Sequence, residues 1–213
     1  MRTWTGADFN GNNLPTQLDQ VSVTIDGKPA YVYYISPTQI NVLSPADAAQ
    51  GSVPVQVTYA GKTSNVVNAA EASLTPALFM FSPLGGKYVA AVRYPDGQYI
   101  GPSNLYPGLS SPTPPWPTVP AKAGDTLLLF GTGFGPTSPT TDFSQTFTGA
   151  PPTANTVTAT IGGVPATVGF AGLVYPGEYQ FNIVVPSVPS GDNLVVLKVN
   201  GVTSQANAYL TVQ

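Results

Sequence analysis

The stretch 126-TLLLFGTGFGPTSP-139 decides the fold, because it is an apolar strand that runs into a glycine-rich corner. The sequence that follows it occurs twice in the 213-residue chain, whereas this stretch occurs once. Residues 21–45 correspond to residues 157–186, with a short insertion near 171–178. Similarity at a fixed spacing indicates a duplicated domain. The aligned pairs are Val21/Val157, Ile25/Ile161, Gly27/Gly163, Pro29/Pro165, Ala30/Ala166, Val32/Val168, Gln39/Gln180, Asn41/Asn182 and Pro45/Pro186.

Each copy is a succession of short alternating segments. Residues 21–25 and 157–161 alternate and end at Asp-Gly or Gly-Gly, a hairpin signal. Further alternating segments follow in both copies, and Gly or Pro interrupts nearly every window. We therefore expect almost no helix. The predicted fold class is all-β, with two tandem immunoglobulin-like antiparallel β-sandwiches, the first lacking its opening strands.

The second copy has an additional segment in front. Residues 77–81 are its predicted first strand, and residues 126–130 are its predicted second strand, central and buried. Between them lie a hairpin insert at 84–104, which turns at Pro95-Asp96-Gly97, and a proline-rich connector at 110–120. The predicted domains are 1–75, an incomplete sandwich, and 76–213, a complete one.

The missing strands of the first copy matter energetically. Two such apolar strands would bury about six large side chains, worth on the order of 10 kcal/mol. That is comparable with the total stability of a domain, about 5–15 kcal/mol. Three explanations stay open. The chain is a fragment of a longer protein, another subunit supplies the strands, or residues 5–18 cover the gap, although they are too polar to replace 126–130.

The order of motifs resembles a known domain. GTGFGP at 131–136, IGGVPATVGFAG at 161–172 and PGEYQFN at 176–182 resemble a C-terminal β-sandwich domain of large secreted proteins of Acidobacteria, the Solibacter type, which is related to IPT/TIG immunoglobulin-like domains. The resemblance covers 76–213 fully and 1–75 from its third strand onward. It implies secretion or surface display and carries over no catalytic residue.

Composition excludes several kinds of chemistry. The net charge of −3 argues against nucleic-acid partners, and no run of 18 apolar residues predicts a membrane span. The absence of His and Cys removes the usual general base and the usual zinc and haem ligands. We expect no enzyme activity, no metal and no cofactor. The opening residues have no apolar segment like that of a secretion signal. The chain is therefore expected either to be cytosolic or to begin after a processed segment or at an artificial boundary.

Aromatic residues are the candidates for ligand binding. They lie in the insert and connector, where exposed rings could stack on sugars: Tyr88, Tyr94, Tyr99, Tyr106 and Trp116. The alternative is that these rings pack the insert onto the sandwich or meet a neighbouring domain. The glycine-rich corner loosely resembles a phosphate-binding loop, but Pro136 and Pro139 prevent the helix that such a loop needs.

These observations predict a non-catalytic structural or adhesive module of a secreted or cell-surface protein. One hypothesis is a self-assembling fibre subunit, completed by strands exchanged head to tail between chains. The partners are then further copies or neighbouring domains of a longer chain. The hairpin at 88–100 and the C-terminal strand are the candidate donors. The predicted interface residues are Val21, Val23, Ile25, Ala208, Leu210 and Val212. The alternative function is a carbohydrate-binding accessory module of a secreted hydrolase.

Overall fold

The computed structural model describes residues 1–47, 49–81, 86–103, 105 and 117–213. In these residues the fold consists of antiparallel sheets, one short 3-10 helix, η1 (Gly6–Asp8), and no α-helix. The prediction of an all-β, immunoglobulin-like fold is confirmed. The chain divides into two compact units. Unit 1 is Met1–Ser73 with Thr141–Gly149 and Tyr175–Gly177, and unit 2 is Leu74–Thr140, Ala150–Val174 and Glu178–Gln213.

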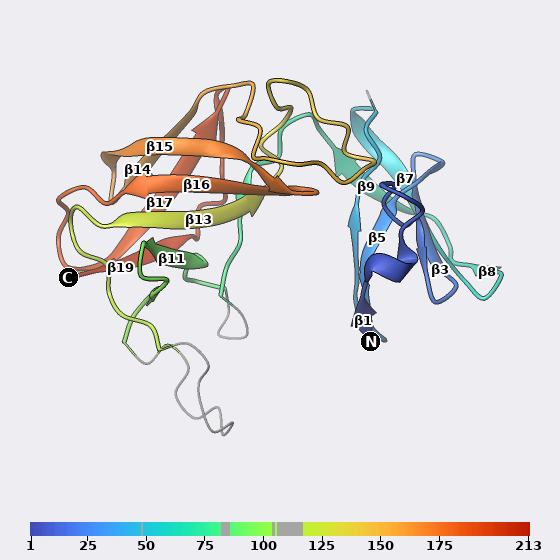
Figure 1. The fold of residues 1–213 in the computed structure, drawn as a ribbon, viewed down its shortest axis with the longest axis horizontal. Coiled ribbons are helices and arrows are strands. Elements are labelled where there is room, and N and C mark those ends of the chain that lie inside the picture. The colour runs from blue at the N-terminus through green and yellow to red at the C-terminus, as the bar shows by residue number, and fades with distance from the viewer. Residues whose placement is uncertain (48, 82–85, 104, 106–116) are drawn as a thin grey trace. The chain divides into compact units, whose positions relative to one another are not determined.

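Unit 1 contains two sheets (Figure 1). The smaller sheet has the order β1-β5-β6, formed by β1 (Arg2–Thr3), β5 (Tyr31–Ile35) and β6 (Ile40–Leu43). The larger sheet has the order β2-β3-β7-β8, formed by β2 (Gln17–Leu18), β3 (Val21–Ile25), β7 (Gly51–Tyr59) and β8 (Lys62–Thr63). Two further strands join the larger sheet, β4 (Lys28–Pro29) beside β3 and β9 (Val67–Glu71) beside β7.

Unit 2 is built on one long, connected set of strands in the order β12-β11-β13-β16-β15-β14-β17-β18, with β10 paired to β13 and β19 paired to β17. Their bounds are β10 (Ala77–Leu78), β11 (Ala91–Tyr94), β12 (Tyr99–Ile100), β13 (Thr126–Thr132), β14 (Val157–Ile161), β15 (Val164–Tyr175), β16 (Glu178–Val184), β17 (Gly191–Val199), β18 (Val202–Thr203) and β19 (Tyr209–Val212).

The two copies form equivalent hairpins, as their turn residues predicted. β3 turns into β4 through Asp26 and Gly27, both with positive φ, and β14 turns into β15 through Gly162 and Gly163, also with positive φ. Two consecutive positive-φ residues suit the tight turn that matches the twist of paired strands. The long pairings are also in equivalent register, because Val21 pairs with Tyr59 in unit 1 and Val157 pairs with Val199 in unit 2.

The stretch that distinguishes the two copies is a buried central strand, as its sequence predicted. Leu127 and Leu129 of β13 are at most 1% exposed and pair with Ile183 and Phe181 of β16. Beyond β13 the chain runs against residues 75–77, and a Cβ atom on Gly133 would overlap the backbone of Thr75. The glycines are therefore required because two backbones approach closely at this corner.

The hairpin predicted between residues 88 and 100 is present, with Val92 of β11 paired to Tyr99 of β12. It is not an appendage, because Ala91 of β11 also pairs with Leu129 of β13. Small or moderate side chains such as Val89 and Ala91 are nearly fully buried there. Residues 84–85, 104 and most of the predicted connector, 110–116, lie outside the described residues.

Candidate interaction groove in unit 1

Strand β6 pairs with β5 along one edge, and no described strand pairs with its other edge. The Ser36 N–H donates to the Gln39 C=O, which directs Gln39 toward β5. Backbone directions alternate along an antiparallel strand, so Ile40 and Val42 direct their N–H and C=O groups to the open edge. In unit 2, the equivalent positions on β16 are paired with β13.

Strand β9 likewise pairs with β7 and, among the described residues, with no strand on its other side. In unit 2, the equivalent edge of its counterpart β19 accepts hydrogen bonds. The Val89 N–H donates to the Tyr209 C=O at 3.0 Å, and the Ala121 N–H donates to the Thr211 C=O at 2.9 Å. One stretch of unit 2, from Val89 to β13, therefore covers both strand edges whose equivalents are open in unit 1.

Part of the inner face of unit 1 is exposed as a result, although Val23 and Val53 on it are buried. The β3–β7 and β14–β17 registers align Tyr59 with Val199, and their side chains are 60% and 0% exposed. The β7–β9 and β17–β19 registers align Val67 with Ala208, which are 60% and 0% exposed. Exposed large apolar side chains that cluster on one surface indicate a binding surface.

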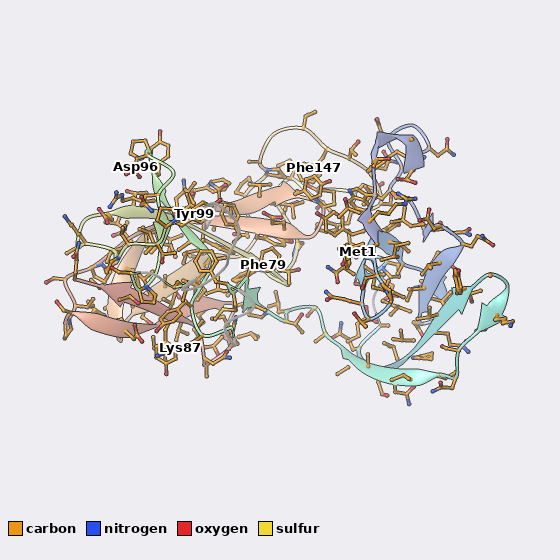
Figure 2. All side chains as sticks on the ribbon, turned by 90° about the horizontal axis from the view of Figure 1, so that it is seen from below. Met1, Phe79, Lys87, Asp96, Tyr99 and Phe147 are labelled. Atoms are coloured by element: carbon orange, nitrogen blue, oxygen red, sulfur yellow. The ribbon has the colours of Figure 1, made fainter. Side chains whose placement is uncertain are left out.

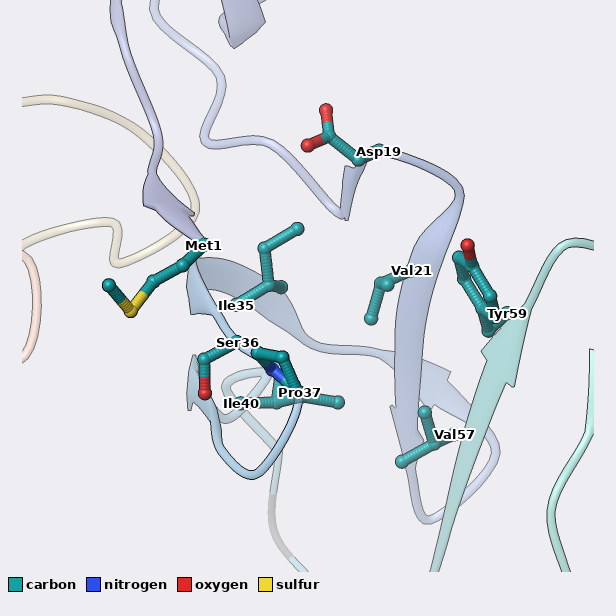
Figure 3. A pocket seen from close by; sticks show the side chains of 9 residues that line it. All are labelled: Met1, Asp19, Val21, Ile35, Ser36, Pro37, Ile40, Val57 and Tyr59. Atoms are coloured by element: carbon teal, nitrogen blue, oxygen red, sulfur yellow. The ribbon is translucent and has the colours of Figure 1, made fainter.

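A cavity of about 500 Å³ opens between the two sheets of unit 1. We call this cavity, together with the open edges of β6 and β9, the unit 1 groove. Figure 3 shows Val21, Val57 and Tyr59 on the larger sheet and Ile35 and Ile40 on the smaller one. The residues that line the cavity are Met1, Asp19, Val21, Ile35, Ser36, Pro37, Ile40, Val57 and Tyr59.

The N-terminal segment contributes apolar side chains to the core of unit 1. Trp4, Leu14 and Leu18 are at most 7% exposed and form a core cluster with Val32 and Ile35. However, β1 pairs with β5 on the edge opposite β6. The N-terminal segment therefore buries three apolar side chains and leaves the edge of β6 open, so it does not take the place that residues 126–130 occupy in the second copy.

Two loops of the second copy belong to unit 1 and support this segment. The Trp4 Nε1–H donates to the Tyr175 hydroxyl at 2.9 Å, and the Trp4 ring lies 5.0 Å from the Tyr33 ring in an edge-to-face arrangement. The Leu14 N–H donates to the Ser144 C=O at 2.9 Å. Unit 1 thus depends on residues far along the chain, which a single division after residue 75 does not describe.

Charged residues fix the start of β1. The Arg2 guanidinium lies 2.8 Å from both the Asp8 and the Asp19 carboxylates. Hydrogen bonds from Arg2 are the main reason that the pKa values of both carboxyl groups lie below their ordinary range. Because Asp19 lines the cavity, this ion-pair network borders the groove at one end.

A second charged feature lies at the far end of the larger sheet. Glu71, the last residue of β9, pairs with Gly51, the first residue of β7. Its Oε2 atom is buried and has no hydrogen-bond partner among the described residues. Burial raises the pKa of the Glu71 carboxyl, and the negative charges of Asp47 and Asp26 raise it further. Asp47 is itself paired, 3.0 Å from Lys28.

The structure separates the predicted interface residues into two sets. Val21 lines the cavity, while Val23 is buried and Ile25 is half-buried in the same strand. Ala208, Leu210 and Val212 are at most 2% exposed, because β19 pairs with β17 in the core of unit 2. The role of the C-terminal strand as a donor to a second chain stays a prediction.

The predicted ligand-binding aromatics have different surroundings. The Tyr88 hydroxyl donates to Asp192 at 2.9 Å, and the Tyr99 ring lies 6.1 Å from Phe81. Tyr94 is 62% exposed. Tyr106 and Trp116 lie outside the described residues. Figure 2 shows Tyr99 and Phe79 on unit 2. A sugar-binding role for this set stays a prediction.

The described part of the chain holds no group of three or more His, Cys, Asp or Glu side chains that could bind a metal ion. Nor does any helix in it have the length and apolarity needed to cross a membrane.

The comparisons with known proteins bear on unit 1. Residues 5–73 match the family model of the IPT/TIG domain. Such domains are generally non-catalytic, immunoglobulin-like interaction modules. No curated protein matches the chain. The predicted relation to IPT/TIG domains is therefore confirmed for residues 5–73, and the more specific acidobacterial domain type stays a prediction.

Glu71 was not among the predicted site residues, although the alignment of the two copies distinguishes it. When the last strands of the two copies are aligned, Val67, Ala69 and Glu71 correspond to Ala208, Leu210 and Val212, respectively. The first copy therefore has an acidic residue at a position that is apolar in the second copy.

Proposed function

We propose that the chain is a non-catalytic structural module of an extracellular or cell-surface protein, and that its first unit is completed by a strand from another polypeptide chain. The observation that carries this proposal is the open edge of β6 beside an apolar cavity, where unit 2 has β13. Addition of an extended strand to an exposed edge is a common mode of recognition. Strand exchange of this kind joins modules into larger assemblies.

The pairing of β13 with β16 in unit 2 indicates which side chains the added strand needs. Leu129 and Leu127 pair with Phe181 and Ile183, which are equivalent to Ile40 and Val42. An antiparallel strand with large apolar residues at those two positions would cover the inner face of β6 and hydrogen-bond to its open edge. Each buried apolar side chain contributes roughly 1.5–3 kcal/mol, so the two together contribute about 3–6 kcal/mol. A Kd of about 1 μM requires about 8 kcal/mol, so the backbone hydrogen bonds to β6 must supply the rest.

A synthetic peptide with the sequence of residues 119–132 is the direct probe, because this segment fills the equivalent space in unit 2. Fluorescence anisotropy of the labelled peptide should show saturable binding, one peptide per chain. Val42→Pro removes an N–H from the open edge and should abolish binding, because proline cannot donate a hydrogen bond. The sheet should tolerate this substitution, because proline occurs on edge strands. Val42→Thr keeps that N–H and is the matched control.

Binding that survives Val42→Pro would contradict strand addition at β6, and absence of binding to the unmodified chain would contradict the proposal altogether. Far-UV circular dichroism of both variants verifies that the sheets remain folded. A polar peptide of equal length, with Leu127 and Leu129 replaced by Ser, should not bind.

A further inference from the structure

Glu71 is an acidic residue at a position on the inner face of unit 1 that is apolar in unit 2. Its counterpart is Val212, since Gly51 pairs with Glu71 and Gly191 pairs with Val212 in equivalent hairpins. Val212 is 2% exposed and lies among apolar side chains. Replacing such a residue by a carboxylate is unfavourable unless the charge has a partner. The described residues of unit 1 supply no hydrogen-bond partner for Glu71 Oε2.

Unit 2 shows which residue lies next to this position when the sandwich is complete. Ala121 forms a parallel bridge with Val212, and the Gln213 N–H donates to the Ala121 C=O at 2.9 Å. Ala121 is fully buried. Side chains of directly paired residues lie on the same face of a sheet, so a residue at the Ala121 position of an added segment would place its side chain beside Glu71.

The same segment continues into the strand that pairs with β16. Ala121 is followed by Leu127 and Leu129, which are paired with Ile183 and Phe181. The segment makes a turn at residues 123–124, where the Asp125 N–H donates to the Lys122 C=O at 3.0 Å. One polypeptide with such a turn can therefore contact Glu71 with an early residue and fill the groove beside Val42 and Ile40 with later ones.

The charges around Glu71 favour a cation at that point. Asp47 and Asp26 both act on its carboxyl group, and the nearby Lys28 is already paired with Asp47. Burial and the two aspartates raise the pKa of the Glu71 carboxyl, and the opposing effect of Lys28 does not outweigh them. A basic side chain placed there would supply the missing donor and offset the local excess of negative charge.

We propose that unit 1 selects a segment that carries Arg or Lys at the position of Ala121, followed after a turn by a strand with large apolar residues at the positions of Leu127 and Leu129. This inference rests on the proposed function and adds the chemical class of the partner strand. Glu71 acts as the determinant of specificity, while the apolar groove supplies most of the affinity.

Three peptides of residues 119–132 test the inference: the parent sequence, Ala121→Arg and Ala121→Glu. Anisotropy titrations should give a Kd for the Ala121→Arg peptide about tenfold lower than for the parent, as expected for a partly desolvated ion pair. The Ala121→Glu peptide should bind more weakly than the parent. The Ala121→Arg advantage should shrink as the salt concentration rises.

Variants of the chain assign the effect to Glu71. In Glu71→Gln, which keeps the shape, the three peptides should bind with nearly equal Kd. In Glu71→Lys, the order should reverse, so that Ala121→Glu binds best. Reversal cannot result from loss of folding, and unchanged thermal melting of Glu71→Gln provides a further control.

The outcomes separate the two proposals. Equal binding of all three peptides to the unmodified chain would overturn the role of Glu71 and leave strand addition intact. Binding of none would overturn strand addition itself. An advantage of Ala121→Arg that persists in Glu71→Gln would place the selecting charge elsewhere and overturn the inference.

Discussion

The two units contain the same hairpins in equivalent register, yet one buries its whole inner face and the other leaves part of it exposed. Leu197 and Val199 of β17 are completely buried, whereas the equivalent Val57 is half-buried and Tyr59 is 60% exposed. The residues common to both copies therefore specify strand pairing. Closure of the sandwich requires the segment in front of the second copy, which contains β10 to β13.

The comparison also shows how unit 1 keeps its shape without that segment. The N-terminal residues supply Trp4, Leu14 and Leu18 to a small core, and the loops at 141–149 and 175–177 contact them. This core lies against β5 and does not replace a partner for β6. Unit 1 is stabilised on one side of its small sheet and open on the other.

Matched truncations at equivalent positions should show the largest difference between the units. Leu197→Ala creates a cavity in a closed core and should lower the free energy of unfolding by about 2–5 kcal/mol. Val57→Ala lies beside an open groove and should cost about 1 kcal/mol or less. Hydrogen exchange at increasing urea concentrations, followed separately in peptide fragments from each unit, measures both changes in the free energy of unfolding. Equal costs, after allowance for side-chain size, would mean that unit 1 is closed in solution.

Glycine positions should give the next largest contrast. Gly133→Ala forces a Cβ atom against the backbone of Thr75 and also strains a positive φ, so we expect a loss of at least about 2 kcal/mol in unit 2. Gly27→Ala has the same strain but open space around it, and should cost about 1 kcal/mol in unit 1. Thermal unfolding with unit-specific exchange measures both losses. Similar losses would argue that the contact with Thr75 is unimportant.

A smaller effect is expected where unit 1 depends on its distant loop. Trp4→Phe keeps an aromatic ring and removes the hydrogen bond to Tyr175, which should cost about 1 kcal/mol. Tyr175→Phe removes the same bond from the other side. In a double-mutant cycle, the combined loss should be smaller than the sum of the single losses. Simple additivity would show that the two side chains act independently.

The pH dependence should be the most modest contrast. Asp8 and Asp19 have depressed pKa values, so the stability they add is present above their unfolded pKa and is lost as the pH falls through their folded values. Glu71 has a raised pKa, so its unfavourable contribution is relieved as the pH falls. Urea unfolding between pH 7 and pH 3 should therefore show a steeper acid loss in Glu71→Gln than in the unmodified chain. A shallower loss in that variant would contradict the sign.

The sequence predicted the features that depend on local chemistry. Alternation and paired turn residues such as Asp26 and Gly27 indicated the hairpins, and the apolar run containing Leu127 and Leu129 indicated the buried strand. The absence of an equivalent strand in the first copy predicted an open sandwich. These features follow from period and turn geometry alone.

What the sequence did not predict depends on contacts distant along the chain. Ala91 and Val89 are too small to mark a core strand, yet β11 lies beside β13. Tyr175 is in a loop of the second copy and contacts Trp4 of unit 1. The significance of Glu71 appears only when its pairing with Gly51 is compared with that of Val212. None of these relations is visible from local pattern or propensity.

Hydrogen exchange at single amides tests most directly whether the edge of β6 is open and accepts a strand. The Ile40 and Val42 amides should exchange rapidly in the isolated chain, whereas the equivalent Phe181 and Ile183 amides, paired with β13, should be strongly protected. Saturation with the 119–132 peptide should slow Ile40 and Val42 by at least about tenfold and leave Phe181 and Ile183 unchanged. Strong protection of Ile40 and Val42 in the isolated monomer, or no slowing when peptide is bound, would contradict the account.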